Sequence, residues 1–362
     1  MHTWLEINKK NILFNLKRFR KIIGEDKLLM PVIKSNAYGH GIIEIAKLID
    51  HSKLADKICV VNNDEAILLK KNGIHSPILI LSYWAQKNID KNFEYVVYNL
   101  QQAIFLNKLK KNIKIHLKVD TGTSRLGVLN KDFIKFYNQV NKLKHLKIIG
   151  IFTHYANSEE DNAYTREQTK KLMIIKEKIQ KINPKIIYHA ACSAAVMSNP
   201  DNIFDGIRLG LSLYGYWPSL HSKLTAVKNY PWLKLKPALT WKAKIIQIKN
   251  IPKNSFIGYG CSYLAKKNMK IAVLPVGYYE GYDRKLSNCG EVFIKNKRCP
   301  IIGRVCMNLT IIDVSKIKKV KIDDEVELLG KNITAEELAA KLHIINYELI
   351  TRINPLLPRL YN

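Results

Sequence analysis

The amino-acid sequence predicts an α/β fold: an N-terminal (β/α)8 barrel of the TIM type followed by a mainly β C-terminal domain. In the first two thirds of the chain, short apolar runs alternate with segments whose apolar residues recur every three or four positions. This pattern is typical of buried strands that are each followed by an amphipathic helix. After about residue 237, apolar and polar residues alternate with period two between turn signals, as in β strands. We therefore expect one domain over residues 1–236 and a second over residues 237–362.

The barrel prediction depends on the number of strand and helix repeats, which is about eight. A doubly wound sheet has the same local pattern, and strand order cannot be read from one sequence, so that alternative stays open. The expected strands cover residues 28–34, 57–62, 77–83, 95–99, 114–120, 146–154, 186–191 and 207–209, and the expected helices cover 42–49, 65–71, 101–110, 131–143 and 164–182.

The second domain is predicted from stretches with strand-like alternation, which cover residues 240–249, 270–276, 291–294, 305–314 and 325–329. Residues 1–10 are a separate case, because Trp4 to Ile7 alternate in the same way. They can form a strand of the second domain ahead of the barrel.

Composition excludes several classes of protein. The 362 residues include 59 Lys and Arg against 30 Asp and Glu, a net charge of +29, but the lysines are spread in pairs along the chain. A solvated surface explains this better than a specific nucleic-acid site, which concentrates charge on one face. No apolar run approaches the roughly 20 residues that cross a bilayer. The N-terminus lacks the apolar core of a secretory signal, so we expect a cytoplasmic protein that does not bind membranes.

The six cysteines are scattered, with no Cys-x-x-Cys pair, and no histidine pair has metal-ligand spacing. We therefore expect free thiols and no metal site.

The most informative segment surrounds Lys34, which ends an apolar run and precedes a glycine-containing loop. Strand ends of this kind carry the reacting groups of barrel enzymes. Burial lowers the pKa of a lysine and makes its amine a nucleophile suited to Schiff-base chemistry. The alternative is an ordinary surface lysine whose stem covers apolar residues.

The segment Lys-Ser-Asn-Ala-Tyr-Gly-His-Gly at residues 34–41 closely resembles the pyridoxal 5'-phosphate lysine motif of alanine racemases. This resemblance implies that Lys34 carries the cofactor covalently and that Tyr38 contacts its phosphate.

Residues 118–127 resemble a second motif of the same family. The resemblance implies that Arg125 orients the substrate carboxylate and that Lys118, often carbamylated in relatives, holds Arg125 in place. A planar guanidinium matches a carboxylate well. An ordinary surface ion pair between Arg125 and Asp120 is the alternative interpretation.

Two further segments resemble the cofactor-binding motifs of the family. His154 and His189 match its active-site histidines, and Ser193 and its backbone N–H match its phosphate ligands at a helix start. Cys192 stands where asparagine is usual, and packing is its preferred interpretation. Arg208 matches the arginine that meets the pyridine nitrogen, and Gly210 and Leu211 would add backbone N–H groups to the phosphate site.

In the second domain, Tyr259 resembles the catalytic tyrosine of the family and Met307 the residue whose backbone meets the substrate carboxylate. Without the resemblance, a tyrosine between glycines is simply a turn residue. Tyr279, Glu280 and Asn308 replace the usual residues on the substrate side.

The resemblance covers essentially the whole chain, and it implies a pyridoxal-phosphate-dependent alanine racemase with two bases, Lys34 and Tyr259. In the family the tyrosine comes from the second subunit, so a homodimer with shared active sites is implied, and in a bacterium the product would be D-alanine for peptidoglycan. The alternatives are a racemase of another small amino acid such as serine, a barrel-type decarboxylase, which Arg208 argues against, and a cofactor-binding protein without turnover.

Overall fold

The computed structural model describes residues 1–160 and 162–362, which divide into two compact units. The first, called the barrel unit, consists of Ile12–Ala37 and Ile42–Lys236. The second, called the β unit, consists of Met1–Asn11, Tyr38–Gly41 and Pro237–Asn362.

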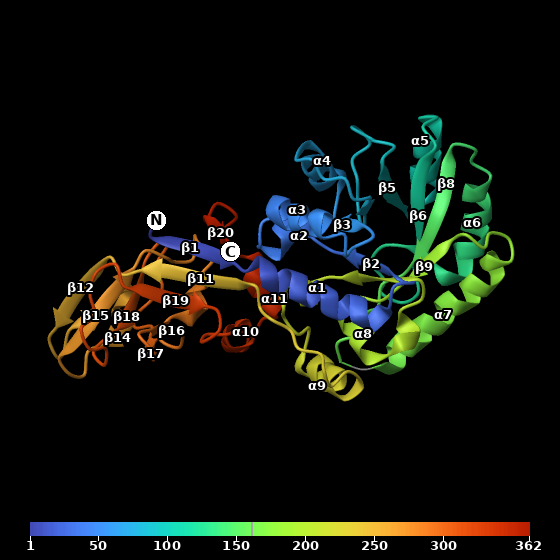
Figure 1. Cartoon of the computed structure of the whole chain (residues 1–362). Helices are drawn as coiled ribbons and strands as arrows, with labels where there is room; N and C mark the ends of the chain where they lie inside the picture. Colours follow the sequence, from blue (N-terminus) through green and yellow to red (C-terminus); the bar gives the residue numbers. More distant parts are fainter. Residues whose placement is uncertain (161) are drawn as a thin grey trace. The chain divides into compact units, whose positions relative to one another are not determined.

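The barrel unit contains a closed ring of parallel strands (Figure 1). Within the described residues the ring has eight members in the order β2, β3, β4, β5, β6, β8, β9 and β10. Closure occurs where β10 pairs with β2, with Arg208 opposite Met30. Val32 bridges to Cys59 beside β3, and the Arg208 N–H donates to the Ala191 carbonyl beside β9 at 2.9 Å. The predicted α/β barrel is therefore confirmed. The strands are β2 Leu28–Pro31, β3 Ile58–Val60, β4 Ile78–Ile80, β5 Phe93–Val97, β6 Ile113–Asp120, β8 Leu146–Phe152, β9 Ile187–His189 and β10 Gly206–Leu209, with the short β7 Val128–Leu129 paired to β6.

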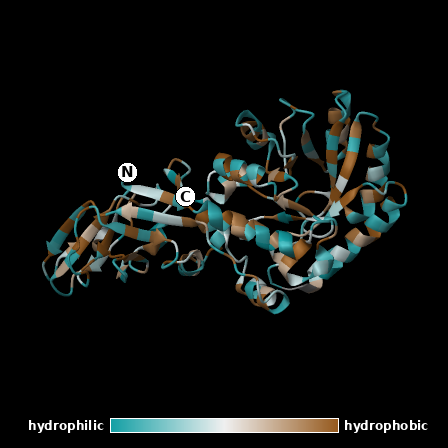
Figure 2. Cartoon of the chain, viewed as in Figure 1, coloured by the Kyte–Doolittle hydropathy of each residue, from teal (hydrophilic) through white to brown (hydrophobic). Residues whose placement is uncertain are grey.

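The ring forms because its strands are apolar on both faces. Every residue of β3, β4 and β5 is buried, as expected for parallel strands that are covered on both sides. Figure 2 shows hydrophobic residues along these strands and a mixture of hydrophobic and hydrophilic residues on the helices. Polar side chains on such strands stand out, and Glu94, His116, Lys118 and Arg208 are the ones that matter below.

Amphipathic helices accompany the strands. The sequence pattern did not predict α1 (Lys9–Ile23), because lysine, arginine and asparagine interrupt it, yet Ile12, Leu16 and Phe19 form a buried stripe at helical spacing. The helices after α1 are α2 Lys34–Tyr38, α3 Ile42–Ser52, α4 Asn63–Lys71, α5 Leu100–Lys108, α6 Phe133–Asn141, α7 Asn162–Gln180, α8 Ser193–Ser198 and α9 Leu220–Asn229, with short 3-10 turns at η1 Asn130–Asp132, η2 Pro200–Asn202 and η3 Leu211–Tyr214.

The β unit is built on a mainly antiparallel sheet with the order β17, β16, β19, β11, β1 and β20. The N-terminal strand β1 (Thr3–Ile7) lies inside this sheet, antiparallel to β11 and parallel to β20. A second sheet has the order β12, β15 and β18, and β13 and β14 form a hairpin. The bounds are β11 Leu239–Lys244, β12 Gln247–Ile251, β13 Phe256–Ile257, β14 Tyr263–Leu264, β15 Met269–Leu274, β16 Glu291–Ile294, β17 Lys297–Pro300, β18 Thr310–Asp313, β19 Glu325–Leu329 and β20 Arg359–Tyr361, with 3-10 turns at η4 Tyr259–Cys261 and η5 Arg284–Leu286.

Two predicted strands of this unit are wrong in extent. The stretch 240–249 is two strands, because the chain changes sheets at Ile245 and Ile246, whose N–H groups donate to Asp324 and Val273. In the stretch 305–314 only β18 is a strand, since the Cys306 N–H donates to the Leu309 carbonyl at 2.8 Å and turns the chain first.

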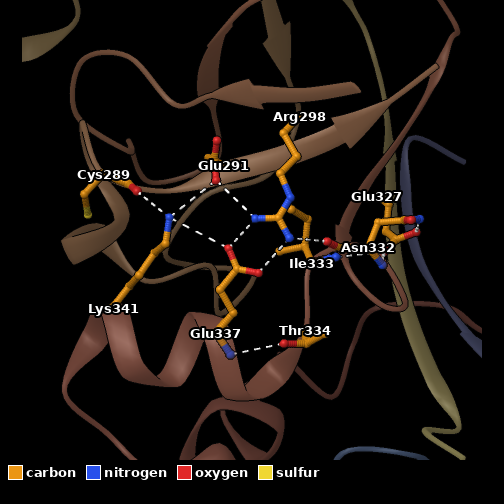
Figure 3. Close-up of polar contacts among 9 residues, drawn as sticks. All are labelled: Cys289, Glu291, Arg298, Glu327, Asn332, Ile333, Thr334, Glu337 and Lys341. Atoms are coloured by element: carbon orange, nitrogen blue, oxygen red, sulfur yellow. Dashed lines mark hydrogen bonds and ion pairs between the residues drawn. The ribbon is translucent and has the colours of Figure 1, made fainter. Parts of the chain in front are cut away.

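The β unit also contains two helices, α10 (Ala335–Leu342) and α11 (Asn346–Thr351). Figure 3 shows how α10 is tied to the β16–β17 hairpin: the Arg298 guanidinium spans both Glu337 carboxylate oxygens at 2.6 and 2.9 Å. Glu291 and Lys341 extend this pair into a network, and Thr334 caps the helix by accepting the Glu337 N–H. Exposed pairs of this kind contribute little singly and more as a network.

No helix within residues 1–160 and 162–362 is long and apolar enough to cross a membrane.

Candidate active site

Lys34 lies just past the carboxyl end of β2, not at the end of the strand as the sequence pattern predicted. Its backbone is placed by the Ile33 N–H, which donates to the Cys59 carbonyl at 2.9 Å. Burial lowers the pKa of the Lys34 amine, and the nearby positive charge of Arg125 lowers it further, whereas Glu65 raises it. The structure thus supports the expected nucleophilic amine.

The strand ends early because the next residues form a left-handed helical turn. Ser35, Asn36, Ala37 and Tyr38 all have φ between +52° and +54°, a conformation that costs roughly 1–2 kcal/mol per residue for L-amino acids. Specific contacts hold the turn in this state. The Ser35 N–H donates to the Glu65 carboxylate at 2.7 Å, and the Asn36 side-chain oxygen accepts the Ile42 N–H at 3.0 Å. Strain of this kind is common beside functional groups.

Tyr38 and the two glycines that follow belong to the β unit. The Tyr38 ring is buried and lies 6.3 Å from the ring of Tyr347. Gly39 has φ +85°, and a Cβ atom there would lie 2.4 Å from the Ile350 carbonyl oxygen. The Gly39 carbonyl accepts a hydrogen bond from Arg359 Nε at 2.8 Å. The C-terminal segments therefore hold the second half of the lysine motif.

Arg208 on β10 is the most heavily bonded side chain of the candidate site, and it is 4% exposed. Nη1 donates to His189 Nδ1 at 2.6 Å, and Nη2 donates to the carbonyls of Thr153 and Ala190 at 2.8 and 2.9 Å. Nη2 also lies 3.4 Å from His154 Nδ1. Among the described residues, the hydrogen bonds of this guanidinium are all made by Nη1 and Nη2, which leaves Nε–H as the donor for a ligand.

His154 and His189 are both held neutral beside this arginine. Burial lowers the pKa of each ring well below its ordinary value, and the charge of Arg208 adds to the effect. Arg125 and Lys118 lower the pKa of His154 further. An arginine beside neutral rings can only donate to them, which determines where their protons lie.

A chain of buried polar groups that the sequence analysis missed extends inward from His189. Its Nε2 lies 3.0 Å from Nδ1 of His116, and Nε2 of His116 lies 3.1 Å from the Glu94 carboxylate. Lys57 Nζ closes the chain with both Glu94 oxygens at 2.6 and 2.7 Å. The only sequence signal is a charged or polar residue inside an otherwise apolar strand.

The expected phosphate ligands on the barrel unit converge on one hydroxyl. Ser193 Oγ accepts the backbone N–H groups of Gly210 at 3.1 Å and Ser212 at 3.3 Å, with Leu211 between them. Cys192 precedes α8 in the N-cap position without a side-chain cap, and its sulfur lies 3.3 Å from Ser158 Oγ. Ser212 is an addition that the motif comparison did not point to.

Lys118 and Arg125 come from β6 and the loop after it. Lys118 is buried among positive charges, and burial together with Arg208 and Arg125 lowers the pKa of its amine to about 8. Arg125 is exposed. The carboxylate of Asp120 accepts the N–H groups of Gly122, Thr123 and Ser124 at 2.9 to 3.1 Å. The backbone of the loop is therefore the hydrogen-bond partner of this carboxylate. Ser124 takes φ +53°.

The remaining candidates, Tyr259 and Met307, lie on the β unit and are 72% and 55% exposed. The unusual residues near Met307 contact one another: the Glu280 carboxylate accepts the Asn308 amide N–H at 2.8 Å and the Gly277 N–H at 2.8 Å. These replacements thus form a bonded pair that fixes the residue after Met307.

A closed parallel barrel with a lysine of lowered pKa after its first strand, a buried arginine on its last strand and an added β domain defines a particular class of barrel enzyme. The family model of the alanine racemase N-terminal domain matches residues 7–218, and that of the alanine racemase C-terminal domain matches residues 238–361. The chain belongs to the alanine racemase family, a family of isomerases.

Individual relatives agree along the whole length. The chain is 37% identical to an alanine racemase of Halothermothrix orenii and 38% identical to one of Leptospira interrogans, covering 99% of this chain and 96% and 95% of those proteins. It resembles the solved alanine racemase of Clostridium difficile 630 with a TM-score of 0.93 at 33% identity, over 100% and 96% of the two chains. The Bacillus anthracis structure with bound L-Ala-P gives a TM-score of 0.89 at 28% identity, over 100% and 95%.

Proposed function

We propose that this protein interconverts L-alanine and D-alanine and that pyridoxal 5'-phosphate is its cofactor. The observation that carries the proposal is Arg208. Its Nη atoms are used by the protein, Nε–H is left as a donor, and β10 pairs with the strand that leads to Lys34. The family membership of the whole chain supports the same activity.

The residues present fit this cofactor. An aldehyde requires an unprotonated amine, and the lowered pKa of Lys34 favours one. A phosphate requires clustered donors, and the Ser193 hydroxyl lies against the backbone of Gly210 and the following residues in the barrel unit. Gly210, Leu211 and Tyr38 are the further phosphate ligands that the family motifs imply. His154 and His189 would complete the binding set through Arg208.

When bound, the cofactor supplies an electron-accepting ring that acidifies the α-proton of the amino acid joined to it. Arg208 sets the strength of this effect, because an arginine is always a donor and cannot accept a proton at working pH. Arg208 would therefore donate to the pyridine nitrogen of the cofactor, and this nitrogen would carry no proton of its own. This keeps the acidifying effect moderate and disfavours side reactions such as transamination.

Two groups would move the protons. Lys34 acts at one face of the substrate α-carbon and Tyr259 at the other, so that one removes a proton and the other returns one to the opposite face. A tyrosine acts as a base near neutral pH only if positive charge stabilises its phenolate. Arg208, acting through His154, would supply that charge. Arg125, positioned by Lys118, and the Met307 backbone would bind the substrate carboxylate.

We further propose that Tyr259 acts in the active site of a second subunit. A catalytic tyrosine and a substrate-binding residue are strongly exposed on the β unit of a single chain, which supports a partner surface that covers them. The domains would then have separate tasks, with residues 1–236 holding the cofactor and residues 237–362 supplying Tyr259 and Met307 to the other chain of a homodimer. Supply of D-alanine for peptidoglycan is the corresponding cellular role.

The test is Tyr259→Phe, which removes one hydroxyl. We expect racemisation of L-alanine, followed by circular dichroism, to fall at least about 100-fold, as for the loss of a general acid–base group. The visible absorbance of the cofactor should remain, whereas Lys34→Ala should abolish it. Unchanged turnover in Tyr259→Phe would overturn the two-base assignment. A stable alanine signal in the wild type with turnover of L-serine would reassign the substrate.

A further inference from the structure

We propose that Glu94 fixes the orientation of Arg208 by setting the tautomers of His116 and His189. These residues would be positioning residues for the reaction, since none of them is expected to touch the substrate. The inference about the reaction rests on the proposed function, whereas the chain itself is a property of the barrel.

The contacts form one continuous path inside the barrel unit. Arg208 Nη1, His189, His116 and the Glu94 carboxylate follow one another at 2.6, 3.0 and 3.1 Å. None of these side chains is more than 4% exposed. They lie on four different strands, β10, β9, β6 and β5, and reach the path because each strand places one polar residue within an apolar core.

Both ends of the path impose the same direction on its protons. Arg208 can only donate, so His189 Nδ1 must accept and its Nε2 must carry the proton. His189 then donates to His116 Nδ1, and the Nε2–H of His116 donates to Glu94. At the far end, Lys57 and His116 hold the pKa of Glu94 at about 2, so this end stays an acceptor. Two neutral rings of one tautomer are the only arrangement that satisfies every contact.

The positive charges around Arg208 explain why a carboxylate at the far end of the path matters. Arg208 makes no direct ion pair with a carboxylate among the described residues, and Lys34, Lys118 and Arg125 add positive charge to the same site. A buried cation without compensation is strongly disfavoured. Glu94 and Lys57 form a direct ion pair at 2.6 Å, so the pair acts on the path as a dipole whose negative end faces His116. Cys59, Cys192 and Tyr155 are further titratable groups beside Arg208. Burial raises the pKa of the Cys59 thiol to about 12 and also raises the pKa of Tyr155, which keeps both neutral.

The consequence for the reaction is geometric. His189 and the carbonyls of Thr153 and Ala190 hold the guanidinium in one orientation, and Glu94 keeps His189 in the tautomer that can accept from it. Nε–H is then presented in a fixed direction toward the ring nitrogen that it would bind.

The first experiment measures histidine tautomers by NMR of the 15N-histidine-labelled protein as purified, with His116→Gln and His189→Gln used for assignment. We expect both rings to be neutral with the proton on Nε2 between pH 5 and pH 9. A proton on Nδ1 or a charged ring at either position would overturn the inference. This readout is independent of any activity.

The second experiment compares Glu94→Gln with Asp90→Asn. Both raise the net charge by one, but Asp90 belongs to a partly exposed pair with Lys70. We expect Glu94→Gln to lower kcat for alanine roughly 10- to 100-fold, as for the loss of a partner that orients a directly acting group. KM should change less, and the pH at which the cofactor absorbance changes should move downward. Asp90→Asn should resemble the wild type.

The outcomes separate the two proposals. If no racemisation occurs in the wild type but the tautomers are as expected, the proposed function fails and the path stands. If racemisation occurs and Glu94→Gln retains both kcat and the absorbance profile, the role of Glu94 as a positioning residue is wrong.

Discussion

Lys118 is a buried amine among cations, and its pKa of about 8 makes the stability of the protein depend on pH. The folded-state pKa lies below the unfolded value of 10.5, so between pH 8 and 10.5 the unfolded chain binds more protons. Stability therefore rises with pH through that window. Below pH 8 the charged amine costs the folded state roughly 3 kcal/mol.

Lys118→Met tests this cost, because methionine keeps most of the volume and none of the charge. In buffer depleted of carbon dioxide at pH 7, we expect the variant to be more stable than the wild type by up to roughly 3 kcal/mol. The rise in stability between pH 8 and 10 should disappear. Urea unfolding at a series of pH values measures both effects.

Bicarbonate extends the same experiment, since a carbamate on Lys118 would replace the buried cation by an anion between Arg208 and Arg125. Added bicarbonate should stabilise the wild type and leave Lys118→Met unchanged. A variant less stable than the wild type at pH 7 without bicarbonate would contradict the assignment of a cost to this amine.

The contact between Asn308 and Glu280 makes a second prediction at this scale. Asn308→Asp places a carboxylate where the amide N–H now donates at 2.8 Å, and the two like charges repel. Because Met307 is the neighbouring residue, we expect KM for alanine to rise at least about tenfold above neutral pH, since opposed like charges cost several kcal/mol.

Glu280→Gln in the Asn308→Asp background restores one donor and one acceptor and should bring KM back toward the wild type. Kinetics from pH 6 to 9 on the two single variants and the double variant measure the coupling. Additive effects in the double variant would show that the contact does not position Met307.

Sequence reasoning performs unevenly at the scale of residues. Arg208 and Lys34 lie in motifs that are contiguous in sequence, which is why the sequence alone predicts them as site residues. Glu94 and His116 were missed because their partners are distant in sequence: a glutamate within an apolar strand has no meaning until β6 and β9 bring the histidines beside it. From the sequence, Asn308 and Glu280 are two separate replacements of the family's usual residues, and their contact is not predicted.

Among the elements, the left-handed turn after Lys34 has the clearest physical cost. Gly39→Ala would add a Cβ atom 2.4 Å from the Ile350 carbonyl oxygen at φ +85°. We expect a loss of roughly 2–4 kcal/mol of stability and weaker cofactor binding, from backbone strain plus overpacking. Unfolding and cofactor titration measure the two losses.

Gly73→Ala is the matched control, because Gly73 has φ +80° but nothing within 4 Å of the added atom. It should cost about 1 kcal/mol, the strain of the backbone alone. Equal losses in the two variants would show that the close approach to Ile350 contributes nothing.

The barrel strands were predicted to within a few residues because buried parallel strands have apolar side chains on both faces. The change of sheets at Ile245 was not predictable, since the alternation continues through it without a break. Nor was the left-handed turn, because Ser-Asn-Ala-Tyr has no preference for that conformation. Glu65 and Ile42, contacts outside the turn, impose it.

For the whole molecule, the proposed sharing of active sites in a homodimer predicts complementation between two inactive variants. Lys34→Ala and Tyr259→Phe should each be inactive as homodimers. When they are refolded together in equal amounts, half of the dimers are mixed, and each mixed dimer has one intact site of two. About a quarter of the wild-type activity should return, as expected for sites built across a symmetric interface. No recovery, with mixed dimers verified by mass, would contradict sharing.

The place of β1 within its sheet has a consequence for the time course of synthesis. Residues 3–7 leave the ribosome long before their partners, which are residues 239–244 and 359–361. At common translation rates the first partner emerges roughly 10 to 50 seconds later. During that interval the whole barrel can be completed while β1, a strand of the β unit, remains unpaired on both of its edges. This strand is thus made well before it can be paired, and residues 3–7 are where we expect a chaperone to be needed.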